Sequence, residues 1–376
     1  MPGLLPNIDP NGLLEYSVVY TDRSLNHMSD SFQKVMNDVS SSLKEVYNAE
    51  SVVLIPGGGT YGMEAVARQF ATDKDCLVIR NGWFSYRWSQ ILEMGNIPSK
   101  MTVLKAVQKN PGSQEPFSPV FIDEVVKKIK SEKPAMVFAP HVETSAGIIL
   151  PDDYIKSVSE AVHSVGGMFV LDCIASGAIW VDMEKCGVDI LVSAPQKGWS
   201  ASPAFGMVML SSNASEKIHN TKSTSFSCDL LKWLQIMQTY ESGGHAYHAT
   251  MPTDAIKDFR DTIDETAEFG FDKAQEKQQE LGDRVRSLLQ KHGFISVAGE
   301  GFLAPGVVVS FTSDVNLHNG SKFKNLGMQI AAGVPLQCDE GDDYQTFRLG
   351  LFGLDKLKDV DAAVQKLESV FNQLMS

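Results

Sequence analysis

Two side chains of chemically reactive types each follow an apolar run in this chain. Lys197 lies in the small-residue turn that comes after Ile190–Ser193, and Asp172 ends the run that begins at Met168. In an α/β chain, groups at the carboxyl ends of strands point into the crevice where ligands bind. A partly desolvated lysine can form a Schiff base, and a carboxylate can keep a pyridine nitrogen protonated. The pair therefore points to pyridoxal phosphate as cofactor.

Each of these two residues also has an ordinary alternative. A loop lysine is usually solvated, and an aspartate at a strand end commonly caps a helix or joins a salt bridge. The interpretation as a cofactor site therefore requires a phosphate cradle, a ring-stacking group and a substrate anchor elsewhere in the chain.

A glycine turn is the candidate phosphate cradle. Gly57-Gly58-Gly59-Thr60 follows the apolar run that starts at Ser51 and precedes a helical segment. Glycines let the backbone approach a ligand, the following helix N-terminus favours anions, and the Thr60 hydroxyl is a candidate helix cap. The alternatives are a plain strand-to-helix turn and a nucleotide site, although the spaced-glycine fingerprint of dinucleotide sites is incomplete.

Three further motifs supply the remaining chemistry. An aromatic in Arg80–Tyr86 suits offset stacking on a pyridine ring, and the hydroxyl residues of Val142–Gly147 suit its polar edge. Tyr247 and Thr250 are candidates for the phosphate, and Arg348, apolar on both sides, suits a substrate carboxylate. Singly, each motif also fits a structural role in the core, a loop, a turn or a protein ion pair.

Bulk properties narrow the class of protein. The 376 residues suit two domains, and 43% apolar with 21% charged residues is ordinary for a soluble globular protein. The net charge of −13 makes nucleic acid an improbable partner. Five cysteines without regular spacing favour a reducing compartment. With neither a signal peptide nor a bilayer-length apolar run, we expect a cytoplasmic protein without membrane contact, and we expect no metal site.

The apolar runs alternate with helical patterns, which predicts a largely parallel sheet covered by helices. The expected strands are Ser51 to Ile55, Cys76 to Arg80, Met101 to Leu104, Ala135 to Ala139, Met168 to Asp172, Ile190 to Ser193 and Met207 to Leu210. The expected helices are Met28 to Tyr47, Tyr61 to Phe70, Trp83 to Met94, Ile122 to Ile129 and Asp153 to Val165.

The C-terminal third predicts a second, smaller α+β unit. A long charged helical stretch covers Thr253 to His292, and later runs predict strands at Val307–Phe311 and Phe347–Leu351, then a helix at Lys356–Leu374. We therefore expect an N-terminal arm at 1–25, a large cofactor-binding domain at 26–262 and a small domain with its linking helix at 263–376.

Taken in order, these motifs resemble the class V aminotransferases, which are fold-type-I pyridoxal-phosphate enzymes. The order is Gly-Gly-Thr before a helix, Asn-Gly with an aromatic, Glu-Thr-Ser-Ala-Gly, Asp172, Gln196-Lys197, Tyr-His-x-Thr and Phe-Arg-Leu-Gly. The alanine–glyoxylate and serine–pyruvate branch is the most similar. The resemblance runs from about Asn26 to the C-terminus. It implies an α/β fold with a mostly parallel seven-stranded sheet, a smaller C-terminal domain, and a homodimer whose active sites lie at the subunit interface.

The resemblance also implies roles for single residues. It implies that Lys197 is the catalytic Schiff-base lysine, Asp172 the partner of the pyridinium nitrogen, and Arg348 the anchor of the substrate carboxylate. It implies that Phe84 stacks on the ring and that Thr144 contacts its hydroxyl side. The implied phosphate ligands are Gly58, Gly59, Thr60 and Gln196, with Tyr247 and Thr250 from the other subunit.

The chain departs from this family at three places. The N-terminal arm lacks the usual Pro-Gly-Pro run, Pro195 replaces a small serine-like residue, and Cys173-Ile-Ala-Ser follows the aspartate. None of these removes a group that the chemistry needs. The predicted function is ping-pong transamination from a small amino acid of the alanine or serine type to a 2-oxo acid such as glyoxylate or pyruvate.

Two other activities stay open at this point. A lyase or desulfurase would use a mobile cysteine, and Cys338 in an acidic loop is the candidate, although neighbouring acids disfavour a thiolate. A nucleotide-binding oxidoreductase would use the glycine turn, but it leaves Lys197, Asp172 and Arg348 without roles. A ligand-binding module without catalysis would tolerate loss of Lys197.

Overall fold

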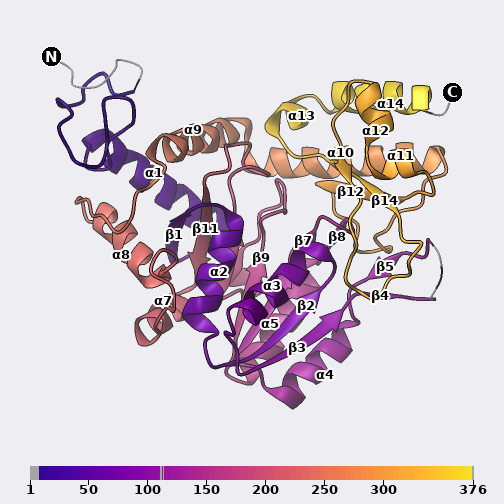
Figure 1. The fold of residues 1–376 in the computed structure, drawn as a ribbon, viewed down its shortest axis with the longest axis horizontal. Helices are drawn as coiled ribbons and strands as arrows, with labels where there is room; N and C mark the ends of the chain where they lie inside the picture. The colour runs from indigo at the N-terminus through magenta and orange to yellow at the C-terminus, as the bar shows by residue number, and fades with distance from the viewer. Residues whose placement is uncertain (1–7, 111, 113, 375–376) are drawn as a thin grey trace.

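This computed structural model describes residues 8–374 apart from 111 and 113, and its centre is a seven-stranded sheet (Figure 1). The strand order is β1-β11-β10-β9-β6-β2-β3. The predicted mostly parallel seven-stranded sheet is confirmed. Its strands are β1 (Ser51–Pro56), β2 (Asp75–Arg80), β3 (Lys100–Lys105), β6 (Met136–Pro140), β9 (Met168–Asp172), β10 (Ile190–Ser193) and β11 (Phe205–Leu210).

Strand directions bring several loop starts to one edge of this sheet. Strands β10, β9, β6, β2 and β3 are mutually parallel, and β11 is antiparallel to both β10 and β1. Strand β1 therefore runs in the common direction as well. Because the carboxyl ends of β1, β2, β6, β9 and β10 share an edge, the residues that follow them converge on one crevice.

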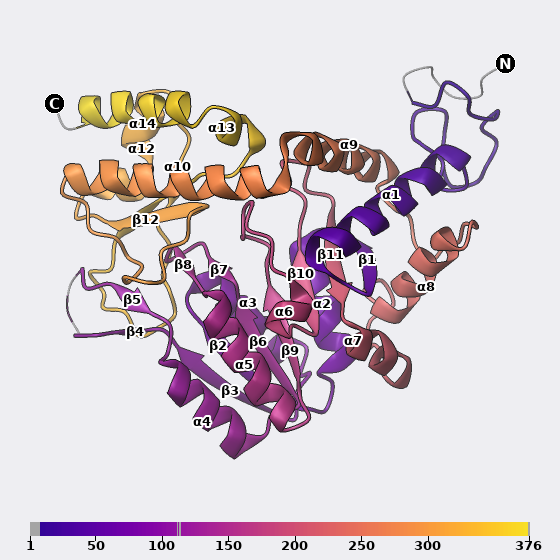
Figure 2. The same cartoon turned by 180° about the vertical axis from the view of Figure 1, so that it is seen from behind.

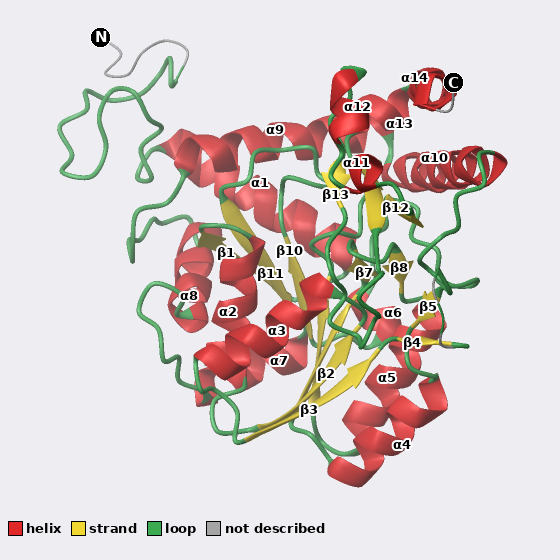
Figure 3. Ribbon diagram, turned by 45° about the vertical axis from the view of Figure 1, so that its right-hand side comes forward, coloured by secondary structure: helices red, strands yellow, loops and turns green. Residues whose placement is uncertain are grey.

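Helices cover both faces of the sheet, in a helix–strand–helix arrangement visible in Figure 3. Helices α2 and α3 lie in front of the sheet in Figure 1, and α5 and α6 lie in front of it in Figure 2. The helices of this part are α1 (Asp30–Tyr47), α2 (Gly59–Phe70), α3 (Trp83–Met94), α4 (Ile122–Glu132), α5 (Asp152–Ser164), α6 (Met183–Cys186), α7 (Ser212–Lys217), α8 (Leu230–Glu241) and α9 (Thr253–Phe269).

Close glycine packing places the start of α2 against the sheet. A Cβ on Gly206 of β11 would lie 2.7 Å from the carbonyl oxygen of Gly58 and 3.0 Å from the backbone nitrogen of Gly62. Real Cβ atoms do not tolerate such distances to backbone atoms, so a side chain here would push the glycine turn away. Gly206 thus fixes the position of the helix N-terminus that begins at the crevice.

The long helical stretch expected at Thr253 to His292 is two helices. The chain turns at Gly270, whose φ of 98° is a conformation that favours glycine, and α10 (Phe271–Lys291) starts there. Helix α10 packs against a second, three-stranded sheet of order β12-β14-β13. The other elements of this part are β12 (Val307–Phe311), α11 (Val315–His318), α12 (Ser321–Asn325), β13 (Ala331–Ala332), β14 (Thr346–Gly350), α13 (Leu354–Lys358) and α14 (Val360–Leu374).

Each sheet has its own apolar core. Phe138, Phe169 and Val192 belong to the large core, whereas Phe347 and Phe371 belong to the core around α10 and α14. Two short hairpins lie beside them, β4 (Val107–Gln108) with β5 (Phe117–Ser118) and β7 (Val142–Glu143) with β8 (Ile148–Ile149).

The N-terminal arm is irregular over 8–25, as expected, and it exposes apolar side chains. Leu13, Leu14, Tyr16 and Val18 are 62–101% exposed. Among the described residues, no helix combines the length and the apolar character needed to cross a bilayer.

Candidate active site

The carboxyl edge of the large sheet brings Asp172 and Lys197 into one crevice. Asp172 ends the central strand β9 and is only 7% exposed. Its Oδ1 accepts a hydrogen bond from the backbone N–H of Ile174 at 3.0 Å, and its Oδ2 has no hydrogen-bond partner within the described part of the chain. Lys197 follows β10, and its Nζ lies 5.7 Å from the ring centroid of Phe84 and 5.6 Å from that of Phe352.

Burial moves both groups toward their neutral forms. Desolvation raises the pKa of Asp172 to about 6, although the Ile174 N–H and the positive charge of Lys197 act in the opposite direction. Desolvation also lowers the pKa of Lys197, against the attraction of Asp172 and Glu143. A lysine with a lowered pKa is a better nucleophile and proton acceptor near neutral pH, which is what the sequence interpretation of Lys197 requires.

Three cationic groups surround the ring of Phe84. The guanidinium carbons of Arg87 and Arg348 lie 5.4 and 5.5 Å from its centroid, and Lys197 Nζ lies at 5.7 Å. Throughout the described residues, none of the three has a carboxylate oxygen within 4.0 Å. A site with unpaired cations around a flat ring is suited to an anionic aromatic ligand.

Glu143 holds the helix that carries Phe84. This carboxylate is fully buried, and its Oε1 accepts from the backbone N–H of Phe84 and of Ser145. Its Oε2 accepts from the backbone N–H and the hydroxyl of Ser85, at 2.8 and 2.7 Å. Glu143 thus caps the N-terminus of α3 from another segment of the chain, and this cap fixes the backbone position of Phe84.

The glycine turn differs in one detail from the sequence expectation. Helix α2 begins at Gly59 with Gly58 as N-cap, and no side chain caps it, so the expected capping by Thr60 is wrong. The Thr60 hydroxyl instead accepts a hydrogen bond from Nη1 of Arg87 at 2.9 Å. A Cβ built on Gly58 would meet no atom within 4 Å, which leaves room for a ligand against this backbone.

Arg348 reaches the crevice from the small sheet. Its Nε donates to the carbonyl oxygen of Ala332 at 2.8 Å, and its Nη1 lies 3.5 Å from the carbonyl oxygen of Thr144. Burial lowers the pKa of the Arg348 guanidinium, which nevertheless stays charged. The second sheet therefore delivers a cation beside the residue expected at the hydroxyl side of the ring.

Not all of the predicted site residues meet within this chain. Tyr247 is 52% exposed, and its hydroxyl pairs with that of Thr250 at 3.0 Å. Its ring contacts His27, at 5.6 Å between centroids, and among the described residues no hydrogen bond or ring contact joins Tyr247 or Thr250 to Lys197. Gln196 lies next to Lys197 but is exposed. The predicted residues that do converge are Gly58, Gly59, Thr60, Phe84, Thr144, Asp172, Lys197 and Arg348.

These residues fit pyridoxal phosphate. The open space at Gly58 lies at a helix N-terminus, a place that favours a phosphate. Asp172 has a free carboxylate oxygen, and Phe84 has a ring among three unpaired cations. A phosphate, a ring nitrogen and an aldehyde thus each find a complementary group.

The structure corrects the expectation of a mobile Cys338. The thiol is 5% exposed and contacts the carbonyl oxygens of Arg80 and Leu336. Burial raises the pKa of Cys338 to about 12, with further contributions from Glu143 and Glu340. A buried neutral thiol lacks the nucleophilicity that desulfurase chemistry needs.

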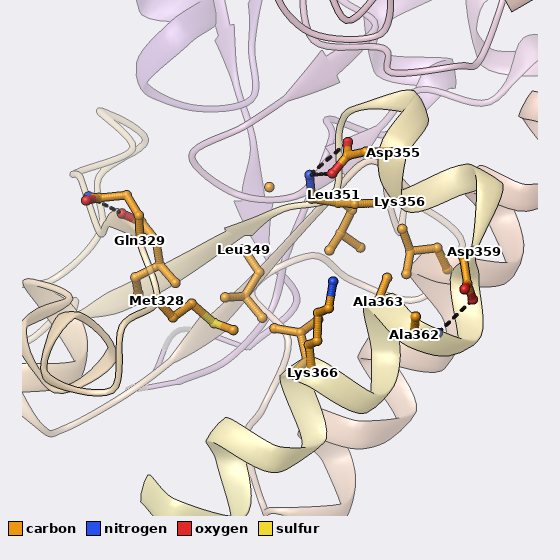
Figure 4. A pocket seen from close by; sticks show the side chains of 14 residues that line it. Met328, Gln329, Leu349, Leu351, Asp355, Lys356, Asp359, Ala362, Ala363 and Lys366 are labelled. Atoms are coloured by element: carbon orange, nitrogen blue, oxygen red, sulfur yellow. Dashed lines mark hydrogen bonds and ion pairs between the residues drawn. The ribbon is translucent and has the colours of Figure 1, made fainter.

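A separate pocket of about 340 Å³ lies between β14 and the helices α10, α13 and α14 (Figure 4). Lys356 and Lys366 line it together with apolar side chains such as Leu349 and Leu351. None of the described residues around Lys197 and Asp172 lines this pocket. Among the described residues, no three His, Cys, Asp or Glu side chains are grouped to hold a metal ion.

Two residues of the site went unassigned in the sequence interpretation. Glu143 begins the Glu-Thr-Ser-Ala-Gly motif, and its signal in the sequence is a carboxylate among the otherwise apolar strand residues of its hairpin. Arg87 lies three residues after Phe84 on α3, so helical spacing places both on one face.

Comparisons with known proteins identify the family of this chain. A family described as "Aminotransferase class-V" matches residues 13–331. An alanine–glyoxylate aminotransferase of Callithrix jacchus is 25% identical, covering 91% of this chain and 81% of its own length. The small subunit of a soluble hydrogenase from a Synechococcus strain is 24% identical, covering 93% and 88%. In structure, an alanine–glyoxylate aminotransferase from Nostoc matches with a TM-score of 0.77 at 20% identity, covering 92% and 89%.

The ionisation of Asp172 gives a first prediction. Because the folded protein raises the pKa of this carboxyl to about 6, the neutral form is favoured at low pH, and stability is lost as the pH rises from about 4 through 6. The loss amounts to about 3 kcal/mol. In the cofactor-free protein, Asp172→Asn should raise the free energy of unfolding at pH 8 by about 1–3 kcal/mol, and the gain should vanish toward pH 4. Urea denaturation at several pH values measures it. A variant no more stable than wild type at pH 8 would show that the carboxylate is well solvated.

Glu143 gives a second prediction. In Glu143→Gln, an NH2 group replaces one acceptor oxygen opposite the N–H groups of α3, so buried donors lose their partner. The free energy of unfolding should fall by about 1–3 kcal/mol in urea denaturation. The control is Glu64→Gln, which breaks only a surface ion pair with Arg68 and should cost less than about 1 kcal/mol. Equal effects of the two variants would contradict the capping role of Glu143.

Proposed function

Because this chain belongs to the class V aminotransferases, which work with pyridoxal phosphate, we propose that it transfers the amino group of a small α-amino acid to a 2-oxo acid. The observation that carries the proposal is the half-buried Lys197 together with the buried Asp172 beside the ring of Phe84. Donors of the alanine or serine type, with glyoxylate or pyruvate as acceptor, are the favoured substrates. The alanine–glyoxylate aminotransferases among the relatives support this choice.

Pyridoxal phosphate supplies, when bound, an aldehyde that joins an amine and a ring that withdraws electrons from the neighbouring carbon. Lys197 provides the amine for that aldehyde. With a substrate amine in its place, Lys197 Nζ would take the proton from the substrate Cα as general base and deliver it, as general acid, to the carbon that carried the aldehyde. Its lowered pKa favours this exchange, because burial shifts Lys197 toward the neutral amine that accepts a proton.

The other residues hold and orient. Asp172 Oδ2, which has no partner in the described chain, would accept a hydrogen bond from the protonated ring nitrogen, and Phe84 would stack on the ring. Thr144 contacts the ring hydroxyl, and Arg348 takes the substrate carboxylate in a bidentate pair. The phosphate is held by Gly58, Gly59, Thr60 and Gln196.

We also propose a homodimer with shared active sites. Tyr247 and Thr250 lie outside the Lys197 cluster of their own chain, as expected if they reach the phosphate of a partner subunit. The exposed apolar residues of the arm are suited to cover a second copy. A cytoplasmic location agrees with five free, buried cysteines. The division into an arm at 1–25, a large domain at 26–262 and a small domain at 263–376 remains part of this proposal.

Lys197→Ala tests the function. The wild-type protein with pyridoxal phosphate should show the visible absorption of the lysine-bound cofactor and should convert alanine and glyoxylate to pyruvate and glycine. The variant should lose that band, and its turnover should fall at least about 100-fold, since the general base is gone. Lys366→Ala, in the separate pocket, is the matched lysine control and should keep both the visible band and the turnover. A variant that retains the band and turnover would overturn the assignment of Lys197.

Subunit mixing tests the shared site. A dimer of one Lys197→Ala subunit and one Tyr247→Ala subunit has one site with an intact Lys197 and an intact Tyr247 from opposite chains. Differently tagged, co-expressed subunits should therefore yield heterodimers far more active than either variant homodimer. If Tyr247 served the site of its own chain, neither heterodimer site would be intact, and activity would stay at the homodimer level.

A further inference from the structure

The two arginines beside Phe84 lie toward different ends of the crevice. Arg348 is tied by Nη1 to the carbonyl oxygen of Thr144, whereas Arg87 is tied by Nη1 to the hydroxyl of Thr60. Their guanidinium carbons are nearly equidistant from the Phe84 centroid, at 5.5 and 5.4 Å. A ring stacked on Phe84 therefore has one arginine on its Thr144 side and the other on its Thr60 side.

The Thr60 side is the anion-binding side of the crevice. Thr60 is the second residue of α2, a twelve-residue helix whose N-cap Gly58 has open space beside it. The free N–H groups of the first turn and the helix dipole favour a phosphate here. Arg87 adds a full positive charge to this partial one, and its anchor on Thr60 keeps the guanidinium at the helix start.

The positive charge of Arg87 has no carboxylate partner among the described residues. The only hydrogen bond of its guanidinium in the described residues goes to a neutral hydroxyl, and no carboxylate oxygen lies within 4.0 Å. Of the two carboxylates of the site, Glu143 is bonded to the N-terminus of α3 through both oxygens, and Asp172 accepts from the backbone of Ile174 through Oδ1. Arg87 nevertheless lies near enough to influence both Asp172 and Lys197 electrostatically.

We propose that Arg87 is a direct ligand of the cofactor phosphate, with Thr60 as the group that orients it. A guanidinium with one N–H held by Thr60 has further N–H groups for phosphate oxygens, and its planar fork suits that geometry. The proposal rests on the proposed function, because it takes the glycine turn as the phosphate end of the site. The competing role is recognition of a second acidic group on the substrate.

Comparison of two aldehydes tests this role. Pyridoxal has the ring and the aldehyde of pyridoxal phosphate but no phosphate, so a phosphate ligand affects only one of them. The full-length cofactor-free protein is titrated with each compound, and binding is followed by the visible band and by quenching of tryptophan fluorescence. The variants are Arg87→Met, Arg87→Lys and, as the matched arginine on the Thr144 side, Arg348→Lys.

In Arg87→Met, affinity for pyridoxal phosphate should fall roughly 10- to 100-fold, while affinity for pyridoxal changes less than about 3-fold. Arg87→Lys should recover part of the loss, because it keeps a point charge. Arg348→Lys should bind both aldehydes as wild type does and should lose affinity for amino acids. Inorganic phosphate, added as a competitor, should inhibit the binding of pyridoxal phosphate less in Arg87→Met than in wild type.

Two results would overturn the proposal. An equal loss of affinity for both aldehydes in Arg87→Met would mean that Arg87 only holds Phe84 or Thr60 in position. Unchanged cofactor affinity with weakened binding of dicarboxylic donors would assign Arg87 to the substrate instead. Failure of the proposed function itself is distinguishable, because wild-type protein would then form no visible band with either aldehyde.

Discussion

The site depends on positive charges that are partly withdrawn from water and that no carboxylate of the described residues pairs with. Lys197, Arg87 and Arg348 gather around one phenylalanine ring, and no carboxylate lies within ion-pair distance in the described residues. Such an arrangement is unfavourable in the empty protein, because desolvated charges lack compensation. An anionic aromatic cofactor compensates these charges. The free-energy cost of the empty site therefore contributes to the affinity for the cofactor.

The two buried carboxylates of the site show how hydrogen bonding separates structural from chemical roles. Glu143 receives N–H and O–H donors on both oxygens and is fixed at the start of α3. Asp172 receives a single backbone donor, and burial shifts its pKa upward to about 6. Saturated bonding makes the first residue part of the scaffold, whereas incomplete bonding leaves the second able to respond to a ligand.

Much of the fold followed from sequence patterns, because buried parallel strands are short apolar runs between helical segments. Strands β9 and β10 and helix α3 have the expected bounds, and Lys197 and Asp172 lie where strand ends place them. The break at Gly270 was not evident, since one glycine within a helical pattern does not reveal its backbone angle. Contacts between distant segments were equally hidden. The bond of Arg87 to Thr60, the cap by Glu143 and the burial of Cys338 depend on tertiary packing.

Arg348 is carried by a different core from the one that holds Phe84 and Asp172. Its neighbour Phe347 packs with Phe294, Phe323 and Phe371, while its guanidinium contacts the carbonyl oxygen of Thr144 and lies 5.5 Å from the ring centroid of Phe84. Under the proposed function, the substrate anchor Arg348 depends on the packing of the small aromatic core, whereas Phe84 and Asp172 depend on the large sheet and its helices. A third apolar cluster, which includes Ala146 and Val309, joins the two. A packing change in the small aromatic core, far from the reacting atoms, would then move the substrate anchor more than the cofactor contacts.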